Sequence, residues 1–442
     1  MTTEVTSVPD DWGPPRHGPL AALRGLLDRP LASYYLLLSS SGLLLVIGLV
    51  MVFSATSVQS YAADGNAYAS VSRQGLFALL GLVAFWYFQR LPARTYRALG
   101  TPLLILSIAL LSVLDLLGLV PGGRVGPIST DPTNNLWLYL GPVELQPSEL
   151  AKLALALWGA GVLAAKGAAI GWWKELSTPL FPVAVLIFLL VGYRDFGTMV
   201  CLVILFYGLL WSAGVRLRVF AGLGIAALAG FALLITMPGF RYRLDRLASF
   251  ADSAQCDRQS TCYQSLHGLY AIADGGWFGV GLGEGRLKWG WLPNGHNDFI
   301  FAVIADELGV VGCFVVLALL SVFAYTGLRI ARRVDDPFRR LVAAGITIWL
   351  VGQATINIGG VVGLLPITGL PLPFISDGGS ALIVTLAAVG LLASFARAEP
   401  DAARALHARP PDRWVRLLWA PLPPLPRDRR PARKKRVAAP RR

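Results

Sequence analysis

Residues 36–53 read LLLSSSGLLLVIGLVMVF, a run without a single charged side chain. About 20 such residues in a helix cross the hydrocarbon core of a bilayer, which is ~30 Å thick. Similar apolar runs occupy residues 103–120, 182–191 and 314–324. Charged residues make up only 15% of the chain and the mean hydropathy is +0.58, whereas soluble globular proteins carry about 25% charged residues. The sequence therefore predicts an integral membrane protein with several spans.

Ten apolar segments are long enough to be transmembrane helices. They lie near residues 34–56, 74–91, 101–120, 148–165, 178–193, 197–213, 217–237, 299–326, 338–362 and 379–398. The expected fold is an all-α polytopic membrane domain over residues 33–398, between an N-terminal tail (1–32) and a C-terminal tail (399–442). The first 30 residues are polar and Pro-rich, and no small-residue cleavage site follows the first apolar run, so we expect the first span to be retained.

Lys and Arg are concentrated in alternate connections between the expected helices, and such connections face the cytoplasm. An even number of spans then places both termini there, and the longest connection, about residues 238–298, faces outward. The tail from Asp401 holds eleven Arg and two Lys against three Asp. We expect this tail to be disordered and to contact anionic lipid in preference to a protein. Nucleic acid is a less favoured partner of this tail than either lipid or protein.

The four cysteines fall into two classes. Cys201 and Cys313 lie within apolar runs, where cysteine usually acts as a small apolar side chain. Cys256 and Cys262 lie six residues apart in the longest connection. A disulfide between them is expected if that loop faces an oxidising exterior; two unbridged loop cysteines are the alternative.

Ionisable residues at the rim of a span are costly unless paired or hydrated, so they are the first candidates for a functional site. Asp298 lies where the longest loop turns into the apolar run 299–304. A partly desolvated carboxylate there could act as a general base, or it could cap the following helix. Asp306 and Glu307, about two turns further on, are expected to pair with a basic residue rather than to line the same cavity. The glycines between residues 275 and 285 are interpreted as turn formers.

Three other polar or irregular features interrupt apolar segments. Lys152 lies one turn inside an otherwise apolar span, where a salt bridge and the binding of an anionic substrate group are equally open. Arg194 and Asp195 are expected to form an internal ion pair or a turn. The run GLLPITGLPLPFISDGGS at residues 363–380 cannot remain helical. It predicts a re-entrant segment that lines a cavity or, as the alternative, a plain outer loop.

These motifs resemble those of the SEDS (shape, elongation, division, sporulation) family, which includes FtsW, RodA and SpoVE. Residues 292–301 read LPNGHNDFIF and residues 306–309 read DELG, similar to the family signature LP-x-x-H-[TN]-DFIF followed by EELG. Residues 146–153, QPSELAKL, and the run 363–380 also resemble family segments. The resemblance spans about residues 35–397 and is greater to the actinobacterial FtsW branch than to RodA.

The resemblance implies a peptidoglycan glycosyltransferase that polymerises lipid II into undecaprenyl-pyrophosphate-linked glycan at the outer face of the bacterial cytoplasmic membrane, at the division septum. Implied partners are a class B penicillin-binding protein (a transpeptidase) and other divisome proteins. Asp298 is implied as the catalytic base. Candidate substrate-binding residues are Lys152, Arg243, Arg246, Arg73, Lys288, His296, Glu307 and Ser376. A divalent cation, Mg²⁺ or Mn²⁺, could assist, although no ligand cluster predicts it. A lipid II flippase and a non-catalytic divisome scaffold are the alternatives.

Three positions depart from the family pattern. Leu136 replaces an Arg that usually precedes the Gln-Pro-Ser motif, and Tyr193 with Arg194 replaces a Gln/Glu-Pro pair. Asp377 stands where the family usually has Tyr or Ala. Each change affects the extracytoplasmic face, so we expect donor binding or regulation to differ from that of other members.

Overall fold

The computed structural model describes residues 25–426 except 26, 131–135, 142, 168–177, 236–261, 287–288 and 290–291. All ten segments that were expected to span the membrane are helical within these residues. They are α2 (Ala32–Asp64), α3 (Ala69–Arg90), α4 (Ala93–Leu117), α5 (Pro147–Lys166), α7 (Leu180–Gly192), α8 (Phe196–Ala213), α9 (Leu217–Ile235), α12 (Ile300–Arg333), α13 (Pro337–Val361) and α14 (Gly379–Arg397). Eight are long and apolar enough to cross a bilayer, and α7 and α9 are shorter apolar helices. The fold is therefore a polytopic helical membrane fold, as predicted.

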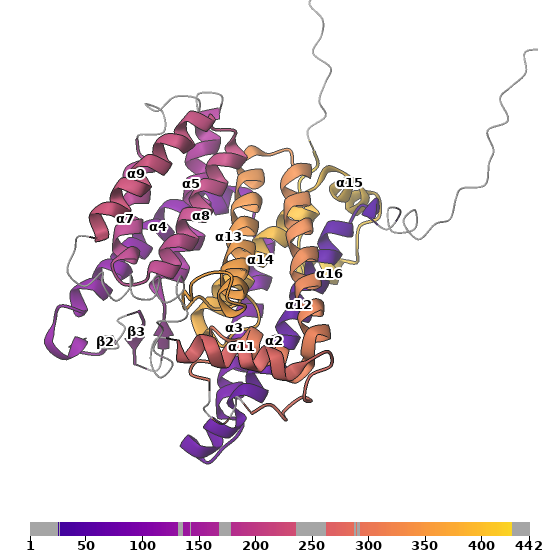
Figure 1. Cartoon of the computed structure of the whole chain (residues 1–442). Coiled ribbons are helices and arrows are strands. Elements are labelled where there is room, and N and C mark those ends of the chain that lie inside the picture. Colours follow the sequence, from indigo (N-terminus) through magenta and orange to yellow (C-terminus); the bar gives the residue numbers. More distant parts are fainter. Residues whose placement is uncertain are drawn as a thin grey trace, which may run out of the picture.

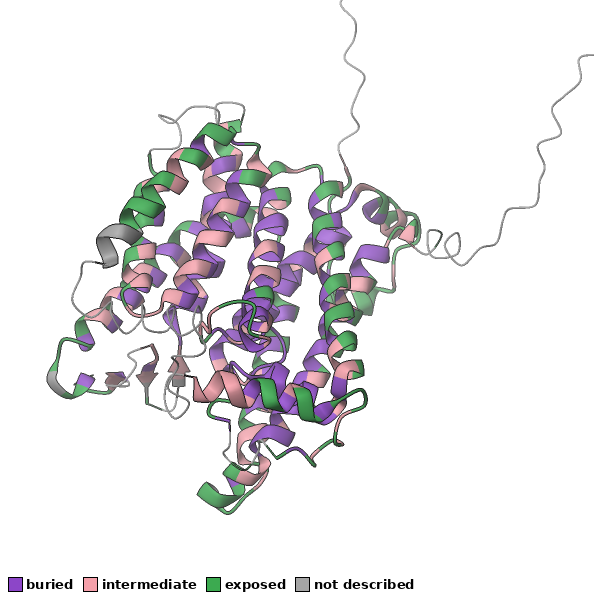
Figure 2. Ribbon diagram, viewed as in Figure 1, coloured by how far each residue is buried: buried purple, intermediate pink, exposed green. Residues whose placement is uncertain are grey.

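The spanning helices form one bundle, and α11 (Tyr263–Gly275) lies across one of its ends (Figure 1). Buried residues follow α5, α13 and α14 along most of their length, whereas α9 is largely exposed (Figure 2). Small residues permit the closest helix contacts: a Cβ added to Gly390 of α14 would meet the backbone of Phe85 in α3. The outward apolar side chains of α3 and α9 are those that lipid would cover.

The connection between α4 and α5 departs from the all-helical expectation. After the short 3₁₀ helix η1 (Pro121–Gly123) it forms β1 (Arg124–Val125), β2 (Ile128–Thr130), β3 (Leu138–Leu140) and β4 (Val143–Leu145). These strands pair antiparallel in the order β1-β2-β3-β4. Strands of two or three residues are too short to produce a clear alternating pattern, which explains why the sequence did not predict them. The sheet lies at the same end of the bundle as α11 (Figure 1).

Helix α12 is broken at Gly309, which has φ 66° and ψ −165°. The glycine-rich chain that follows α11 packs into this break. Val280 and Gly281 donate N–H bonds to the carbonyls of Asp306 and Glu307, and Val310 and Val311 of α12 donate to the two carbonyls that directly follow α11. Broken helix backbone is tolerated at membrane depth only where other groups satisfy it. The glycines therefore do more than form turns, because they let one backbone approach another.

The chain after α14 corrects one expectation. We expected disorder from residue 399 onward, but residues 400–408 form α15 (Pro400–Ala408) and residues 413–418 form α16 (Arg413–Leu418). The reason is tertiary: side chains of α3 donate hydrogen bonds to the carbonyls of Leu418 and Trp419. Residues 427–442, the most basic part of the tail, lie outside the described residues.

Candidate active site

Asp298 lies immediately before α12 and is 8% exposed. Phe299, not Asp298, occupies the capping position of α12, and no side chain caps that helix there. Asp298 instead lines a narrow recess of about 10 Å³ together with residues of α13 and of the 363–378 segment. A carboxylate at a small opening of this kind is shielded from bulk water and still reachable by a substrate hydroxyl, which suits a general base better than a helix cap.

Two amides on α13 hold the recess together. Asn357 Nδ2 donates to the backbone oxygens of Asp298 and Leu370, both at 2.7 Å. One turn away, Gln353 Nε2 donates to Pro371 O at 2.8 Å. These residues were not among the sequence candidates. Their signal was available, because two amides four residues apart in an apolar span lie on one helix face and need partners inside the protein.

The 363–378 segment enters the bundle, so the cavity-lining alternative is confirmed over the plain outer loop. Phe374, Ile375 and Ser376 are buried, and Phe374 adopts φ 70°. A Cβ added to Gly48 of α2 would meet the backbone of this segment. The Ser376 hydroxyl donates to Asn297 O at 2.5 Å and accepts from Leu372 N at 2.7 Å. Ser376 thus ties this segment to the loop that carries Asp298, and its proposed contact with substrate stays a prediction.

Four charged or titratable side chains gather at the outer rim beside this loop. Arg73 Nη1 lies 3.8 Å from Glu144 Oε1, and Arg73 Nη2 lies 3.9 Å from Asp377 Oδ2. The backbone N–H of Asp377 donates to His296 O at 3.1 Å, which fixes Asp377 beside His296. Burial lowers the pKa of His296, although the Asp377 carboxylate opposes this shift. Burial also raises the pKa of Asp377, against the effect of His296 and Arg73.

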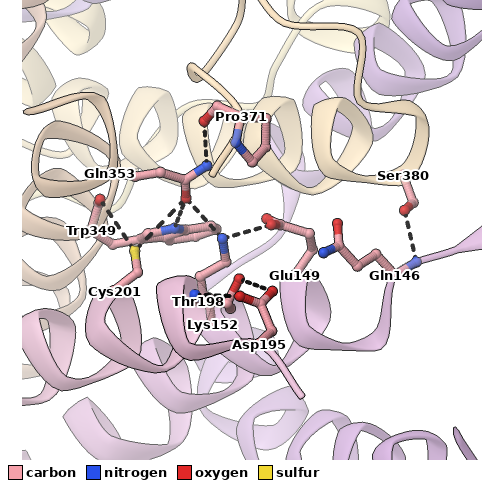
Figure 3. Close-up of polar contacts among 10 residues, drawn as sticks. All are labelled: Gln146, Glu149, Lys152, Asp195, Thr198, Cys201, Trp349, Gln353, Pro371 and Ser380. Carbon is pink, nitrogen blue, oxygen red and sulfur yellow. Dashed lines mark hydrogen bonds and ion pairs between the residues drawn. The ribbon is translucent and has the colours of Figure 1, made fainter. Parts of the chain in front are cut away.

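Lys152 is fully buried between α5, α8 and α13 (Figure 3). Its Nζ donates to Glu149 Oε1 at 2.7 Å and to Gln353 Oε1 at 2.8 Å, and it lies 5.3 Å from the centre of the Trp349 ring. This arrangement favours the salt-bridge alternative over direct substrate binding. Through Gln353 the same cluster reaches Pro371, so Lys152 supports the wall of the Asp298 recess from behind.

Glu307 and Asp306 do not join the Asp298 recess. Glu307 is buried and accepts a hydrogen bond from Ser54 of α2 at 2.6 Å and from the Gly283 N–H at 3.1 Å. No ion pair within 4.0 Å involves either acid among the described residues, but Arg286 is a basic neighbour of Asp306, which it reaches through a backbone hydrogen bond and through its charge. Glu307 therefore joins α2, α12 and the glycine-rich loop, and its binding of substrate stays a prediction.

Arg194 and Asp195 have separate partners. Arg194 Nε lies 2.5 Å from Asp115 Oδ1 of α4, while Asp195 caps α8 by accepting from Thr198 N at 2.9 Å. The expectation of an internal ion pair or a turn therefore holds: Arg194 forms an ion pair with Asp115, and the chain turns at Tyr193 and Arg194 between α7 and α8. Neither residue enters the recess lining.

Four sequence candidates lie outside the described residues: Arg243, Arg246, Lys288 and Cys256. Cys262 is disulfide-bonded, whereas Cys201 and Cys313 are free. The Cys256–Cys262 bridge and the roles of the three cations stay predictions.

Comparison with known proteins identifies the family. A model of the FtsW/RodA/SpoVE family, described as cell cycle protein, matches residues 35–400. The chain belongs to this family. It is 43% identical over 398 residues to a protein of Mycobacterium tuberculosis named probable peptidoglycan glycosyltransferase FtsW, covering 90% of this chain and 74% of the relative. It is 36% identical over 357 residues to stage V sporulation protein E of Bacillus subtilis, covering 80% and 94% respectively.

Solved structures agree with this FtsW/RodA/SpoVE assignment. The fold matches the rod shape determining protein RodA of Thermus thermophilus with a TM-score of 0.57 and 26% identity, over 82% of this chain and 96% of RodA. It also matches a chain of a peptidoglycan synthase complex that coordinates polymerization and crosslinking. The TM-score of this second match is 0.64 at 26% identity, and the match covers 82% of this chain and 96% of the other chain. The SEDS resemblance and the SEDS fold are thus both confirmed.

Proposed function

We propose that this FtsW/RodA/SpoVE protein is a peptidoglycan glycosyltransferase that polymerises lipid II into glycan strands during cell division. The observation that carries the proposal is the position of Asp298, at the start of α12 in a recess whose walls α13 holds with two amides. The relatives named as peptidoglycan glycosyltransferases support the reaction class. The 43% identity to the probable FtsW of Mycobacterium tuberculosis supports a division role.

Asp298 is the general base in this proposal. Its carboxylate takes the proton of the acceptor's GlcNAc 4-hydroxyl as that oxygen attacks C1 of the donor's MurNAc. The bond from C1 to the undecaprenyl pyrophosphate breaks, and the pyrophosphate leaves with its electron pair. A single displacement of this kind inverts the anomeric centre. A positioned base contributes about 10²–10⁴-fold to such a step.

The leaving pyrophosphate gathers negative charge, which nearby cations stabilise. Arg73 is the described candidate, because its side chain is 54% exposed at the rim beside the Asp298 loop. Arg243, Arg246 and Lys288 are the candidates outside the described residues. No three His, Cys, Asp or Glu side chains converge as a metal site within the described parts of the chain. The described residues thus offer no preformed site for a divalent cation.

Orientation and partners complete the proposal. The distribution of basic residues supports cytoplasmic termini and an extracytoplasmic Asp298. The chain matched within a synthase complex supports a class B penicillin-binding protein as partner, which would crosslink the new strands. Contact with other divisome proteins and residence at the septum follow from the division role.

The test is glycan polymerisation from labelled lipid II by the purified protein with its class B partner. We expect Asp298→Ala to lower the rate by about 10²–10⁴-fold, since the base is removed. Asp274→Asn is the matched control, because Asp274 is an exposed carboxylate on α11 at the same end of the bundle, and it should retain wild-type rate. If both variants polymerise equally, Asp298 is structural. If folded wild-type complex makes no polymer but moves lipid II across a bilayer, the flippase alternative holds.

A further inference from the structure

An ordered segment with no part in the proposed reaction lies at the end of the bundle opposite Asp298. Residues 413–420, RWVRLLWA, form α16 and its continuation, and we call them the C-terminal strap. The strap lies where α2 begins and where α3 and α14 end (Figure 1). A disordered tail would have no fixed position there, so the contacts that hold the strap require an explanation.

Helix side chains hold the strap through its backbone. Trp86 Nε1 and Arg90 Nη1 of α3 both donate to Leu418 O, at 2.5 and 3.0 Å. Gln89 of the same helix donates to Trp419 O at 3.3 Å, and Arg397 of α14 donates to Ala420 O at 3.3 Å. These contacts use strap carbonyls, so they leave most strap side chains free to face outward.

The outward side chains are large and apolar. Trp414, Leu417 and Leu418 are 71%, 60% and 62% exposed. A soluble surface rarely presents so many together. Within the bundle, the exposed apolar face of α3 continues into the strap, since Val83 and Tyr87 are also more than half exposed and Trp86 touches the strap directly. Lipid would cover this apolar face of α3, and the strap extends the same apolar surface to the C-terminal end of α3.

Cations accompany these apolar groups. Arg413 and Arg416 lie three residues apart in α16 and share one side of it. The Nε of Arg416 is buried and has no hydrogen-bond partner in the described part of the chain. Arg90 lies at the end of α3, over the ring of Trp86 at 4.7 Å. Trp and Leu side chains interleaved with Arg at the end of a bundle are typical of a membrane interface, where Trp lies at headgroup depth and Arg attracts anionic headgroups.

We infer that the C-terminal strap is an interfacial anchor that lies in the headgroup region of the cytoplasmic leaflet and binds anionic phospholipid. Trp414, Leu417 and Leu418 enter the acyl boundary, while Arg413 and Arg416 contact headgroup phosphates. The anchor fixes where the basic tail leaves the membrane. It does not depend on the proposed glycosyltransferase activity.

The test uses the full chain in lipid nanodiscs. A fluorophore is attached at Val415→Cys, an exposed strap position that leaves Trp414 and both arginines intact. Nanodiscs contain a lipid quencher on the upper acyl chain, in phosphatidylcholine with or without phosphatidylglycerol. We expect strong quenching that increases with phosphatidylglycerol. Each Arg near an anionic surface favours contact roughly fivefold, so Arg413→Gln with Arg416→Gln should abolish the phosphatidylglycerol dependence.

A matched label at Ala408→Cys, exposed at the end of α15, should be quenched much less. The chain without added cysteine, treated in the same way, gives the blank for Cys201 and Cys313. Quenching at residue 415 no greater than at residue 408 would overturn the anchor. The anchor would also be overturned if lipid did not quench the label at residue 415 but addition of the class B partner shielded that label from solvent. The strap would then be a protein-docking surface.

Discussion

At the residue scale, Asn357 is the side chain that joins the two segments of the recess. Its amide donates to Asp298 O and Leu370 O, so Asn357→Ala leaves two buried carbonyls without these donors. A shift of about 1 Å in a catalytic group can cost 10²-fold in rate, and we expect a loss of roughly 10- to 100-fold in kcat. Lipid II polymerisation measures it.

The control for this prediction is Thr355→Ala on the same helix, where the hydroxyl bonds only to Val351 O within α13. It should keep its activity. Equal losses in the two variants would mean that any polar-to-apolar change in α13 is harmful, and Asn357 would lose its positioning role.

Asp377, also at the residue scale, predicts a pH effect. Its carboxylate favours the protonated form of His296 and so opposes the lowering of the His296 pKa. Asp377→Asn removes that charge, so the His296 pKa falls further and the imidazole stays neutral to lower pH. We therefore expect the acid limb of the polymerisation rate to move to lower pH.

A pH–rate profile of wild type and Asp377→Asn checks this shift, with Asp274→Asn as the control for a distant acid. Arg73 and Glu144 remain in both proteins, so changes in their charge do not confuse the comparison. An acid limb that stays in place, or moves to higher pH, would show that the Asp377 charge does not reach the groups that control the rate.

At the element scale, the break in α12 depends on glycines that let backbones touch. A Cβ added to Gly279 would overlap the backbone of Glu307, whereas one added to Gly283 meets nothing within 4 Å. Both residues have φ near 78°. Strain from positive φ, about 1 kcal/mol for alanine, is therefore common to both substitutions. Gly279→Ala should lower the thermal unfolding temperature in detergent far more than Gly283→Ala. Equal shifts would mean that φ alone matters and that the close approach is unimportant.

Also at this scale, the existence of the ten helices followed from the sequence, although α2, α4 and α12 each extend seven or eight residues beyond the expected span at one end. Charge-free apolar runs define spans because an unpaired backbone or charge is expensive in lipid. The sheet β1–β4 and the strap were not predicted. Strands of two or three residues carry too little pattern, and α16 is ordered by the side chains of α3 and α14 rather than by its own propensity.

At the scale of the whole molecule, Lys152 connects α5 to α13 and, through Gln353, to the recess wall. Lys152→Met leaves Glu149 buried without its cation, and removing one partner of a buried ion pair costs about 3–5 kcal/mol. We expect a large drop in thermal stability. The double variant Lys152→Met with Glu149→Gln should recover most of it, because no uncompensated buried charge remains.

The same variants separate the two roles left open by the sequence. If Lys152 is purely structural, the double variant regains polymerisation along with stability. If Lys152 also binds substrate, stability returns and polymerisation does not. Loss of stability in the double variant equal to that in the single one would contradict the ion pair as the source of the effect.

The sequence by itself determined that this is a polytopic membrane protein, where its helices lie, and that Asp298 is the leading candidate for chemistry. These follow from local apolar runs and from motifs that are contiguous in the chain. Only the tertiary structure decided that Asn357 and Gln353 hold the recess, that Glu307 bonds to Ser54, and that the strap is ordered. Each of these contacts joins residues that come from separate elements, and a hydrogen-bond partner is specified by position in space, which no local pattern records.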